Sequence, residues 1–201
     1  MEPNNNPMNI LLITVNPNPH SLTHALANHT AKKAEERGHH VVIRDLYKIK
    51  FNAILGPKDF NQLFDGIVPK DIRREQEHIA DSDLIIFMYP IWWAGAPALM
   101  KGYIDRVILK NFAYEKHSNG TFTKRLTKKK ALIINTMGAS IADYADAGFL
   151  DAMKTVMDRG VIEFVGLQNL GHHFFGESEN LSEEKYHTFI SRLDAILEKI
   201  L

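Results

Sequence analysis

The stretch LIIFMYPIWWAGAPALMKGYIDRVIL, Leu84 to Leu109, decides the fold. Its apolar run from Leu84 to Tyr89 predicts a buried β-strand, and the residues from Ala96 to Leu109 predict a helix. Between them lie a proline, two tryptophans and several small residues, where a turn usually carries polar side chains. A strand, a short loop and a helix in this order form one repeat of an α/β protein with a parallel sheet.

The same alternation extends in both directions along the chain. Further strands are predicted at 9–15, 41–43, 131–135 and 161–165, and further helices at 22–37, 71–80 and 149–159. The last helix is predicted from an apolar stripe at spacings of three and four, namely Tyr186, Phe189, Ile190, Leu193, Ile196, Leu197 and Ile200. The strands are continuous β-branched runs, which is typical of a sheet covered on both faces. We therefore expect an α/β fold: a doubly wound five-stranded parallel sheet of order 2-1-3-4-5 with helices on both faces.

Length and composition limit the remaining possibilities. The 201 residues suffice for one domain, expected at 9–201, preceded by a loose polar tail at 1–8. Lys plus Arg equals Asp plus Glu at 24 each, which gives no basic surface for nucleic acid. The chain has no cysteine and no long apolar stretch, so we expect a cytoplasmic protein without membrane insertion.

The predicted strand order places a ligand site before any motif is considered. In such sheets ligands bind beyond the carboxyl ends of the strands, where the strand order reverses. Three loops meet there, namely 16–23, 89–96 and 136–144. In the first, Ser21 and Thr23 lie where a helix begins and could hold a phosphate, although Ser21 could equally act as a simple helix cap.

No metal site is expected in the first loop. His20 and His24 are four residues apart, His29 lies off their face, and no nearby carboxylate completes a ligand set. We expect these histidines to lie at the surface.

The second and third loops predict a pocket for a flat ligand. Trp92 and Trp93 offer a stacking surface, and we expect one of them to pack beneath the following helix. In the third loop, backbone N–H groups of Gly138 and Ala139 could point into the crevice, and Tyr144 offers a phenol.

Several motifs resemble the NAD(P)H:quinone oxidoreductases of the flavodoxin-like fold. They are FMYPIWWAGAPALMKGYIDRV at 87–107, NFAY at 111–114, RDLYKIKFNAIL at 44–55, INTMGAS at 134–140 and VIEFVGLQNL at 161–170. The resemblance covers most of the chain, from about residue 9 to 170. It implies a bound flavin, NAD(P)H as co-substrate, and two-electron ping-pong hydride transfer to a quinone or a similar flat acceptor such as an azo or nitro compound.

The resemblance also implies site residues. The flavin would be bound by Asn16, Ser21, Leu22, Thr23, Pro90, Ile91, Trp92, Trp93, Ala94, Thr136, Met137, Gly138, Ala139 and Tyr144. Tyr144 is the candidate catalytic residue, donating a hydrogen bond to a developing oxyanion. Family members are homodimers with active sites at the interface, so the substrate would contact Trp93 together with Tyr114 and Phe164 of a second subunit.

The chain departs from the larger family members at three places. Asn16 and Leu150 stand where they have histidines, so a Tyr–His relay is incomplete, and Ala94 replaces a phenylalanine, which widens the substrate slot. The motif at 44–55 favours FAD slightly over FMN. Two other functions stay open: a flavodoxin-like electron carrier without NAD(P)H activity, and a flavin-binding regulatory subunit of a membrane transporter.

Overall fold

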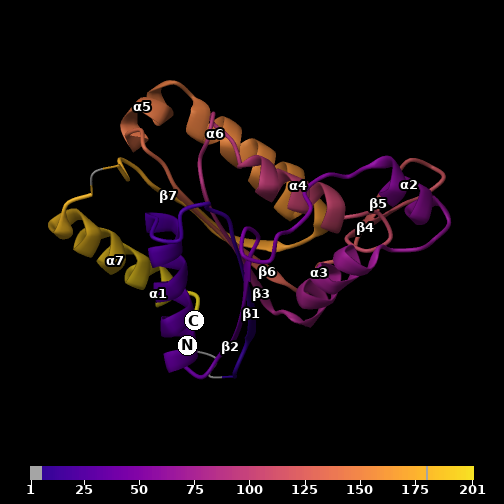
Figure 1. Cartoon of the computed structure of the whole chain (residues 1–201), viewed down its shortest axis with the longest axis horizontal. Coiled ribbons are helices and arrows are strands. Elements are labelled where there is room, and N and C mark those ends of the chain that lie inside the picture. Colours follow the sequence, from indigo (N-terminus) through magenta and orange to yellow (C-terminus); the bar gives the residue numbers. More distant parts are fainter. Residues whose placement is uncertain (1–5, 180) are drawn as a thin grey trace.

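The computed structural model of the chain describes residues 6–179 and 181–201, and it contains one five-stranded parallel sheet (Figure 1). Its strands are β1 (Asn9–Thr14), β2 (His40–Asp45), β3 (Leu84–Pro90), β6 (Lys130–Thr136) and β7 (Gln168–Phe175). They pair in the order β2-β1-β3-β6-β7, which is 2-1-3-4-5 when these five strands are counted along the chain. The predicted fold class is therefore confirmed.

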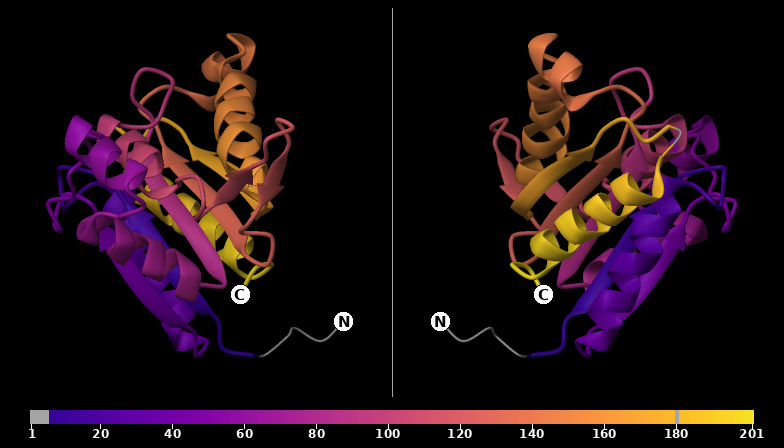
Figure 2. Two further views of the ribbon diagram at one scale, coloured as in Figure 1. Left: turned by 90° about the vertical axis from the view of Figure 1, so that its right-hand side faces the viewer. Right: turned by 90° about the vertical axis from the view of Figure 1, so that its left-hand side faces the viewer.

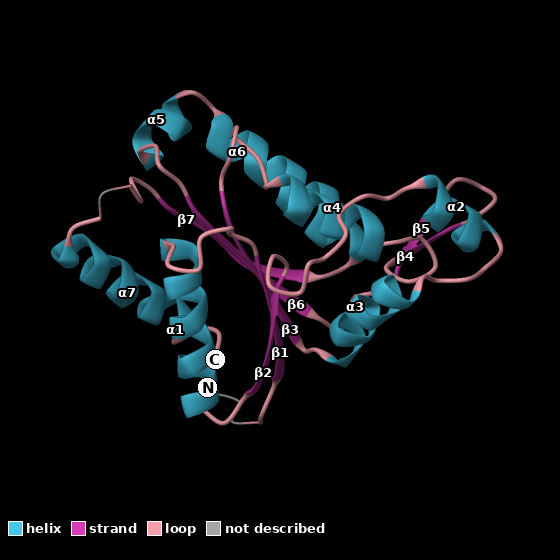
Figure 3. Ribbon diagram, in the orientation of Figure 1, coloured by secondary structure: helices cyan, strands magenta, loops and turns pink. Residues whose placement is uncertain are grey.

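Helices cover both faces of the sheet (Figure 3). They are α1 (Leu22–Glu36), α2 (Pro57–Phe64), α3 (Lys70–Asp81), α4 (Ala98–Val107), α5 (Ile141–Asp146), α6 (Phe149–Lys154), the π-helix η1 (Thr155–Glu163) and α7 (Glu183–Leu197). A small antiparallel hairpin, β4 (Tyr114–Lys116) and β5 (Phe122–Lys124), lies outside the main sheet.

The period of two along the strands divides the core into two layers. On β1, Leu11 and Ile13 belong to the buried cluster that includes residues of α3, α4, α6 and η1, whereas Ile10 and Leu12 belong to the cluster that includes residues of α1 and α7. Figure 2 shows α1 and α7 side by side on their face of the sheet. Burial on both faces explains why the strand sequences do not alternate.

The predicted fifth strand at 161–165 is wrong, because these residues are helical. The chain continues from α6 into η1, and Gly160 does not end the helix. Met157 and Ile162 are both buried although they are five residues apart. The i→i+5 turn of a π-helix brings residues at this spacing onto one face, so a β-branched run is buried here by a helix. The fifth strand is β7 at Gln168–Phe175.

Two further segments differ from the predictions. The region 47–69, where no helix is predicted, contains α2, and the loop 136–144 contains the start of α5. Residues 1–5 of the expected tail lie outside the described residues. Met8 is already fixed to the domain, since its N–H donates to His39 Nδ1 at 3.1 Å. Within the described residues, every helix is too short or too polar to cross a bilayer.

Candidate functional site

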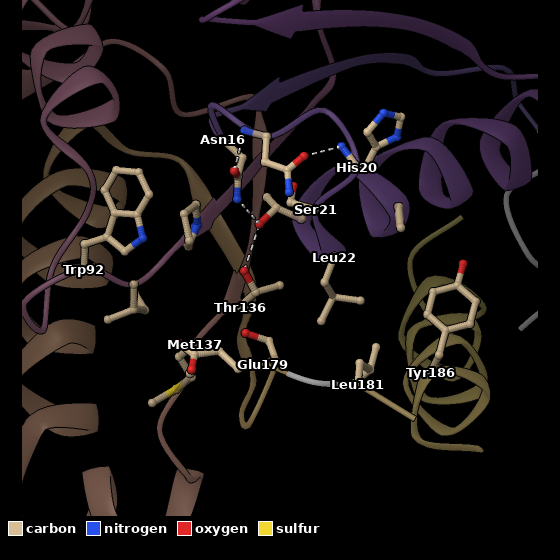
Figure 4. A pocket seen from close by; sticks show the side chains of 17 residues that line it. Asn16, His20, Ser21, Leu22, Trp92, Thr136, Met137, Glu179, Leu181 and Tyr186 are labelled. Carbon is tan, nitrogen blue, oxygen red and sulfur yellow. Dashed lines mark hydrogen bonds between the residues drawn. The ribbon is translucent and has the colours of Figure 1, made fainter. Parts of the chain in front are cut away.

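A cavity of about 560 Å³ opens beyond the carboxyl ends of β1, β3 and β6, where the strand order reverses (Figure 4). Ten of the predicted cofactor residues line it: Asn16, Ser21, Leu22, Thr23, Pro90, Ile91, Trp92, Thr136, Met137 and Gly138. Seven further lining residues are not among the predicted site residues: Asn18, His20, Ala25, Ser178, Glu179, Leu181 and Tyr186. Trp92 lies at one end of the cavity and Tyr186 of α7 at the other.

The first loop is folded by its own side chains. Asn16 Oδ1 accepts from the N–H of Asn18 at 3.0 Å, and Asn18 Oδ1 accepts from the N–H of His20 at 2.9 Å. Ser21 caps α1, its side chain accepting from the N–H of His24. The cap expected for Ser21 is thus present, and the start of α1, where backbone N–H groups lack helical partners, lines the cavity.

Two threonines join the first loop to the third. Thr23 Oγ1 lies 2.8 Å from Thr136 Oγ1, and both residues are buried. Asn16 Nδ2 donates to Thr23 Oγ1 at 3.3 Å. These bonds fix the beginning of α1 against the end of β6, which sets one wall of the cavity.

The tryptophan loop is a tight hairpin. Trp92 and Gly95 exchange two backbone hydrogen bonds of 3.0 and 3.1 Å, and Trp93 and Ala94 between them have φ values of +52° and +53°. This is the backbone of a type I′ turn, which normally requires Gly, Asn or Asp. The turn leaves Trp93 fully exposed and Trp92 about half-exposed, so the expectation that one tryptophan packs beneath the following helix is wrong.

The third loop is bonded to the segment that follows β7. The N–H of Met137 donates to the carbonyl of Phe175 at 2.9 Å, so this amide is not free for a ligand. A Cβ at Gly138 would lie 2.8 Å from Oε1 of Glu179, so a larger residue here would require the Glu179 side chain to move. Glu179 therefore places a carboxylate beside the third loop.

Buried polar groups join the carboxyl ends of β3 and β6. His172 lies 2.7 Å from Asp158 through Nδ1 and 2.6 Å from Asn135 Oδ1 through Nε2. Asn135 in turn donates to the carbonyl of Tyr89 at 3.1 Å. Burial raises the pKa of the Tyr89 phenol above its ordinary value. The ends of β3 and β6 are thus held by hydrogen bonds as well as by the sheet.

Six predicted site residues do not line the cavity: Trp93, Ala94, Ala139, Tyr144, Tyr114 and Phe164. Tyr144 lies on α5 with its ring 5.3 Å from that of Phe149. The ring centroids of Tyr114 and Phe164 lie 5.2 Å apart, and both rings also pack against the ring of Phe122. Trp93 and Ala94 belong to the exposed turn next to Trp92.

The expectation that these histidines lie at the surface is wrong for His24, which is buried. His20 is exposed, His29 lies 2.6 Å from Asp194, and His24 is buried against Asp45. Within residues 6–179 and 181–201 we find no group of three possible metal ligands.

The lining residues fit a flavin. Ser21 and the start of α1 provide hydroxyl and amide donors for a phosphate, and Trp92 provides a flat apolar surface at the other side of the same cavity. Gly138 leaves the third wall without a side chain. A ligand with a phosphate and an aromatic ring system matches this distribution.

Comparison with known proteins agrees with this geometry. The model of the family described as flavodoxin-like fold matches residues 8–197. An uncharacterized NAD(P)H oxidoreductase of Haemophilus influenzae is 36% identical over 85% of this chain and 84% of its own length. NAD(P)H dehydrogenase (quinone) 1 of Rattus norvegicus is 29% identical over 75% of this chain and 62% of its own.

A solved structure supports the fold. The NAD(P)H:quinone oxidoreductase of Methanothermobacter marburgensis superposes with a TM-score of 0.85 at 23% identity, over 94% of this chain and 95% of that one. At this identity the likeness concerns the fold. The family match and the relatives above show that the chain belongs to the NAD(P)H:quinone oxidoreductase family of the flavodoxin-like fold.

Proposed function

We propose that this protein is a flavin-dependent NAD(P)H:quinone oxidoreductase, with residues 9–201 acting as one flavin-binding domain. The observation that carries the proposal is the cavity at the reversal of strand order, which has a helix start with Ser21 on one side and Trp92 on the other. The relatives' names add NAD(P)H and quinone as the reactants. Azo and nitro compounds are further flat acceptors for the same slot.

In this proposal the residues that line the cavity bind the flavin and orient its ring. Ser21 and the amides of the first turn of α1 hold the phosphate, and Pro90, Ile91 and Trp92 border the ring. A flavin held by these residues would supply the redox chemistry of two-electron transfer from NAD(P)H to the acceptor. Donor and acceptor use one slot in turn, so we expect ping-pong kinetics.

FAD is the flavin that we favour. The cavity extends past Ser21 to Leu181 and Tyr186, so an adenosine beyond the phosphate would meet an apolar side chain and an aromatic ring. FMN would leave that end without a ligand group. Mass spectrometry of the cofactor released from purified protein distinguishes the two.

A homodimer completes the acceptor side in this proposal. Tyr114 and Phe164 form an aromatic cluster away from the cavity of their own subunit, and a second subunit would bring its cluster toward the exposed Trp93. Tyr144, on the helix that follows the third loop, is the proposed hydrogen-bond donor to the acceptor. We place the protein in the cytoplasm, since a chain without cysteine needs no oxidising compartment.

The first experiment uses freshly purified protein. A visible spectrum is recorded, NADH or NADPH is added without oxygen, and a benzoquinone follows. Flavin bands that bleach with nucleotide and return with quinone support the oxidoreductase. Bands that stay oxidised with both nucleotides contradict it and favour an electron carrier, and protein that takes up neither FAD nor FMN contradicts the assignment of the cavity.

A variant tests the site itself. Trp92→Ala removes the indole from the cavity, and we expect the Kd for flavin to rise about 2- to 12-fold, from a stacking free energy of about 0.5–1.5 kcal/mol. Phe60→Ala is the control, because Phe60 is an exposed aromatic residue of α2 that does not line the cavity. An unchanged Kd in Trp92→Ala would place the ring elsewhere.

A further inference from the structure

His24 lies directly behind the wall of the cavity. It is buried, three residues into α1 from the capping Ser21, and it is not among the lining residues. Its ring fills the space between the first loop and the end of β2. Any change in this ring therefore acts on the loop that faces the proposed phosphate.

Both ring nitrogens of His24 face hydrogen-bond acceptors. Nε2 lies 3.1 Å from Oδ2 of Asp45, and Nδ1 lies 3.1 Å from the carbonyl oxygen of Asn18. The other oxygen of Asp45 accepts from the N–H groups of Tyr47 and Lys48 at 3.1 and 3.2 Å, so the carboxylate is held in place. A backbone carbonyl and a carboxylate do not donate, and therefore both contacts are hydrogen bonds at once when the ring is an imidazolium.

The protonation of this ring decides what the Ser21 hydroxyl does. Ser21 Oγ lies 3.1 Å from Nδ1. In a neutral ring with its proton on Nε2, Nδ1 is an acceptor and takes the hydroxyl proton of Ser21. In the imidazolium, Nδ1 donates instead, and the hydroxyl proton is free to point at an anion in the cavity.

We infer that His24 is a proton-linked positioning residue for the phosphate end of the cavity, which binds flavin phosphate more tightly when His24 is protonated. The inference rests on the proposed function, since it takes the anion to be a flavin phosphate. Asp45 is the charged side chain that contacts His24, and the start of α1 adds the positive end of a helix dipole. His20 is the other titratable group of this loop; it lines the cavity from the exposed side.

The sign of the effect follows from linkage. The imidazolium favours binding, so binding takes up a proton and the Kd rises as pH rises. The limiting slope is about tenfold in Kd per pH unit for one linked proton. The second ionisation of an FMN phosphate, near pH 6, acts in the opposite direction because the dianion binds a helix start better. FAD lacks this ionisation, and riboflavin lacks the phosphate.

The test measures Kd by quenching of flavin fluorescence between about pH 5 and pH 8, the range in which histidine titrates. For the wild type we expect the Kd of FAD to rise with pH and that of riboflavin to stay level. His24→Asn places an amide N–H near the position of Nδ1, keeps the bond to the loop at every pH, and should remove the slope. His29→Asn is the matched control, since His29 is on the same helix and also pairs with a carboxylate, 2.6 Å away on Asp194.

Each result decides the matter. Three results would overturn the inference while leaving flavin binding in place. The first is a level FAD curve in the wild type, and the second is a pH slope that persists in His24→Asn. The third is a slope that His20→Asn abolishes and His24→Asn leaves intact. Absence of flavin binding at every pH overturns the proposed function and this inference together. If His24→Asn does not fold, calorimetry of FAD binding to the wild type in two buffers of different ionisation heat replaces it, and zero proton uptake refutes the linkage.

Discussion

The turn at Trp93 and Ala94 pairs backbone strain with an exposed aromatic side chain. Both residues have φ above +50°, a conformation that costs an L-residue about 1–2 kcal/mol. The sequence Asn-Gly adopts the same turn without strain. A double variant, Trp93→Asn with Ala94→Gly, should therefore keep the hairpin and its two bonds between Trp92 and Gly95.

The double variant should be more stable than the wild type. Glycine at 94 relieves about 1–2 kcal/mol but adds about 0.4–1 kcal/mol of entropy to the unfolded chain, and asparagine at 93 relieves part of the same cost. Trp93 is fully exposed, so no burial is lost. We expect a gain of about 1 kcal/mol, which for a domain of this length raises Tm by about 2–4 °C.

Activity should change in the opposite direction. If Trp93 stacks on the acceptor, its loss removes about 0.5–1.5 kcal/mol and lowers kcat/KM for a quinone about 2- to 12-fold. Thermal unfolding and quinone reduction are measured on the same preparation. Lys50→Gly is the control, since Lys50 has a φ of +51° away from the cavity and should gain stability without losing activity.

Two outcomes would refute this reasoning. A double variant that is less stable than the wild type would show that the indole is packed, against its exposure here. A variant that is more stable and equally active would show that the strain serves no function in catalysis.

Two further predictions concern the scaffold. A Cβ at Gly102 would lie 2.3 Å from the carbonyl oxygen of Ala53, so Gly102→Ala should lower the free energy of unfolding in urea by about 1–3 kcal/mol. Gly160→Ala, whose nearest contact would be at 3.7 Å, should raise it by about 0.5–1 kcal/mol. The hydrogen bond from Arg106 lowers the pKa of Asp59, so this pair stabilises the fold above the ordinary carboxyl pKa and the effect is lost as pH falls below about 4. Arg106→Met should flatten that part of the stability profile, and an unchanged acid slope would assign it to other carboxylates.

The sheet could be predicted from the sequence because its strands are buried on both faces. A continuous apolar run such as Leu84–Tyr89 identifies a buried strand without knowledge of the strands that pair with it. The prediction of the fifth strand was wrong because this strand lacks such a run. Gln168–Phe175 is mixed in polarity, and its register is irregular next to Gly171. The apolar run before it belongs to a π-helix. A local pattern reports burial, and it does not say which kind of element provides that burial.

The site was predictable as far as it depends on the ends of strands. The three loops follow β1, β3 and β6, and their residues meet at one cavity. Tyr186 and Glu179 were missed, because each reaches the cavity from a distant part of the chain. The apolar stripe of the last helix marked Tyr186 as a core residue, and the turn at Trp93 gave no sequence signal for its left-handed backbone.

The walls of the cavity form a frame joined by hydrogen bonds, and the turn at Trp93 lies outside it. Ile91 N–H donates to the carbonyl of Thr136 at 2.7 Å, and Thr136 bonds to Thr23, so the walls are tied to the sheet and to each other. The turn at Trp93 is held by its own two bonds and projects from this frame. Changes in the frame should therefore alter folding and flavin affinity together, whereas changes in the turn should alter the choice of acceptor while flavin stays bound. Separate measurement of flavin Kd and of kcat/KM over a series of acceptors would show whether the two functions divide at this boundary.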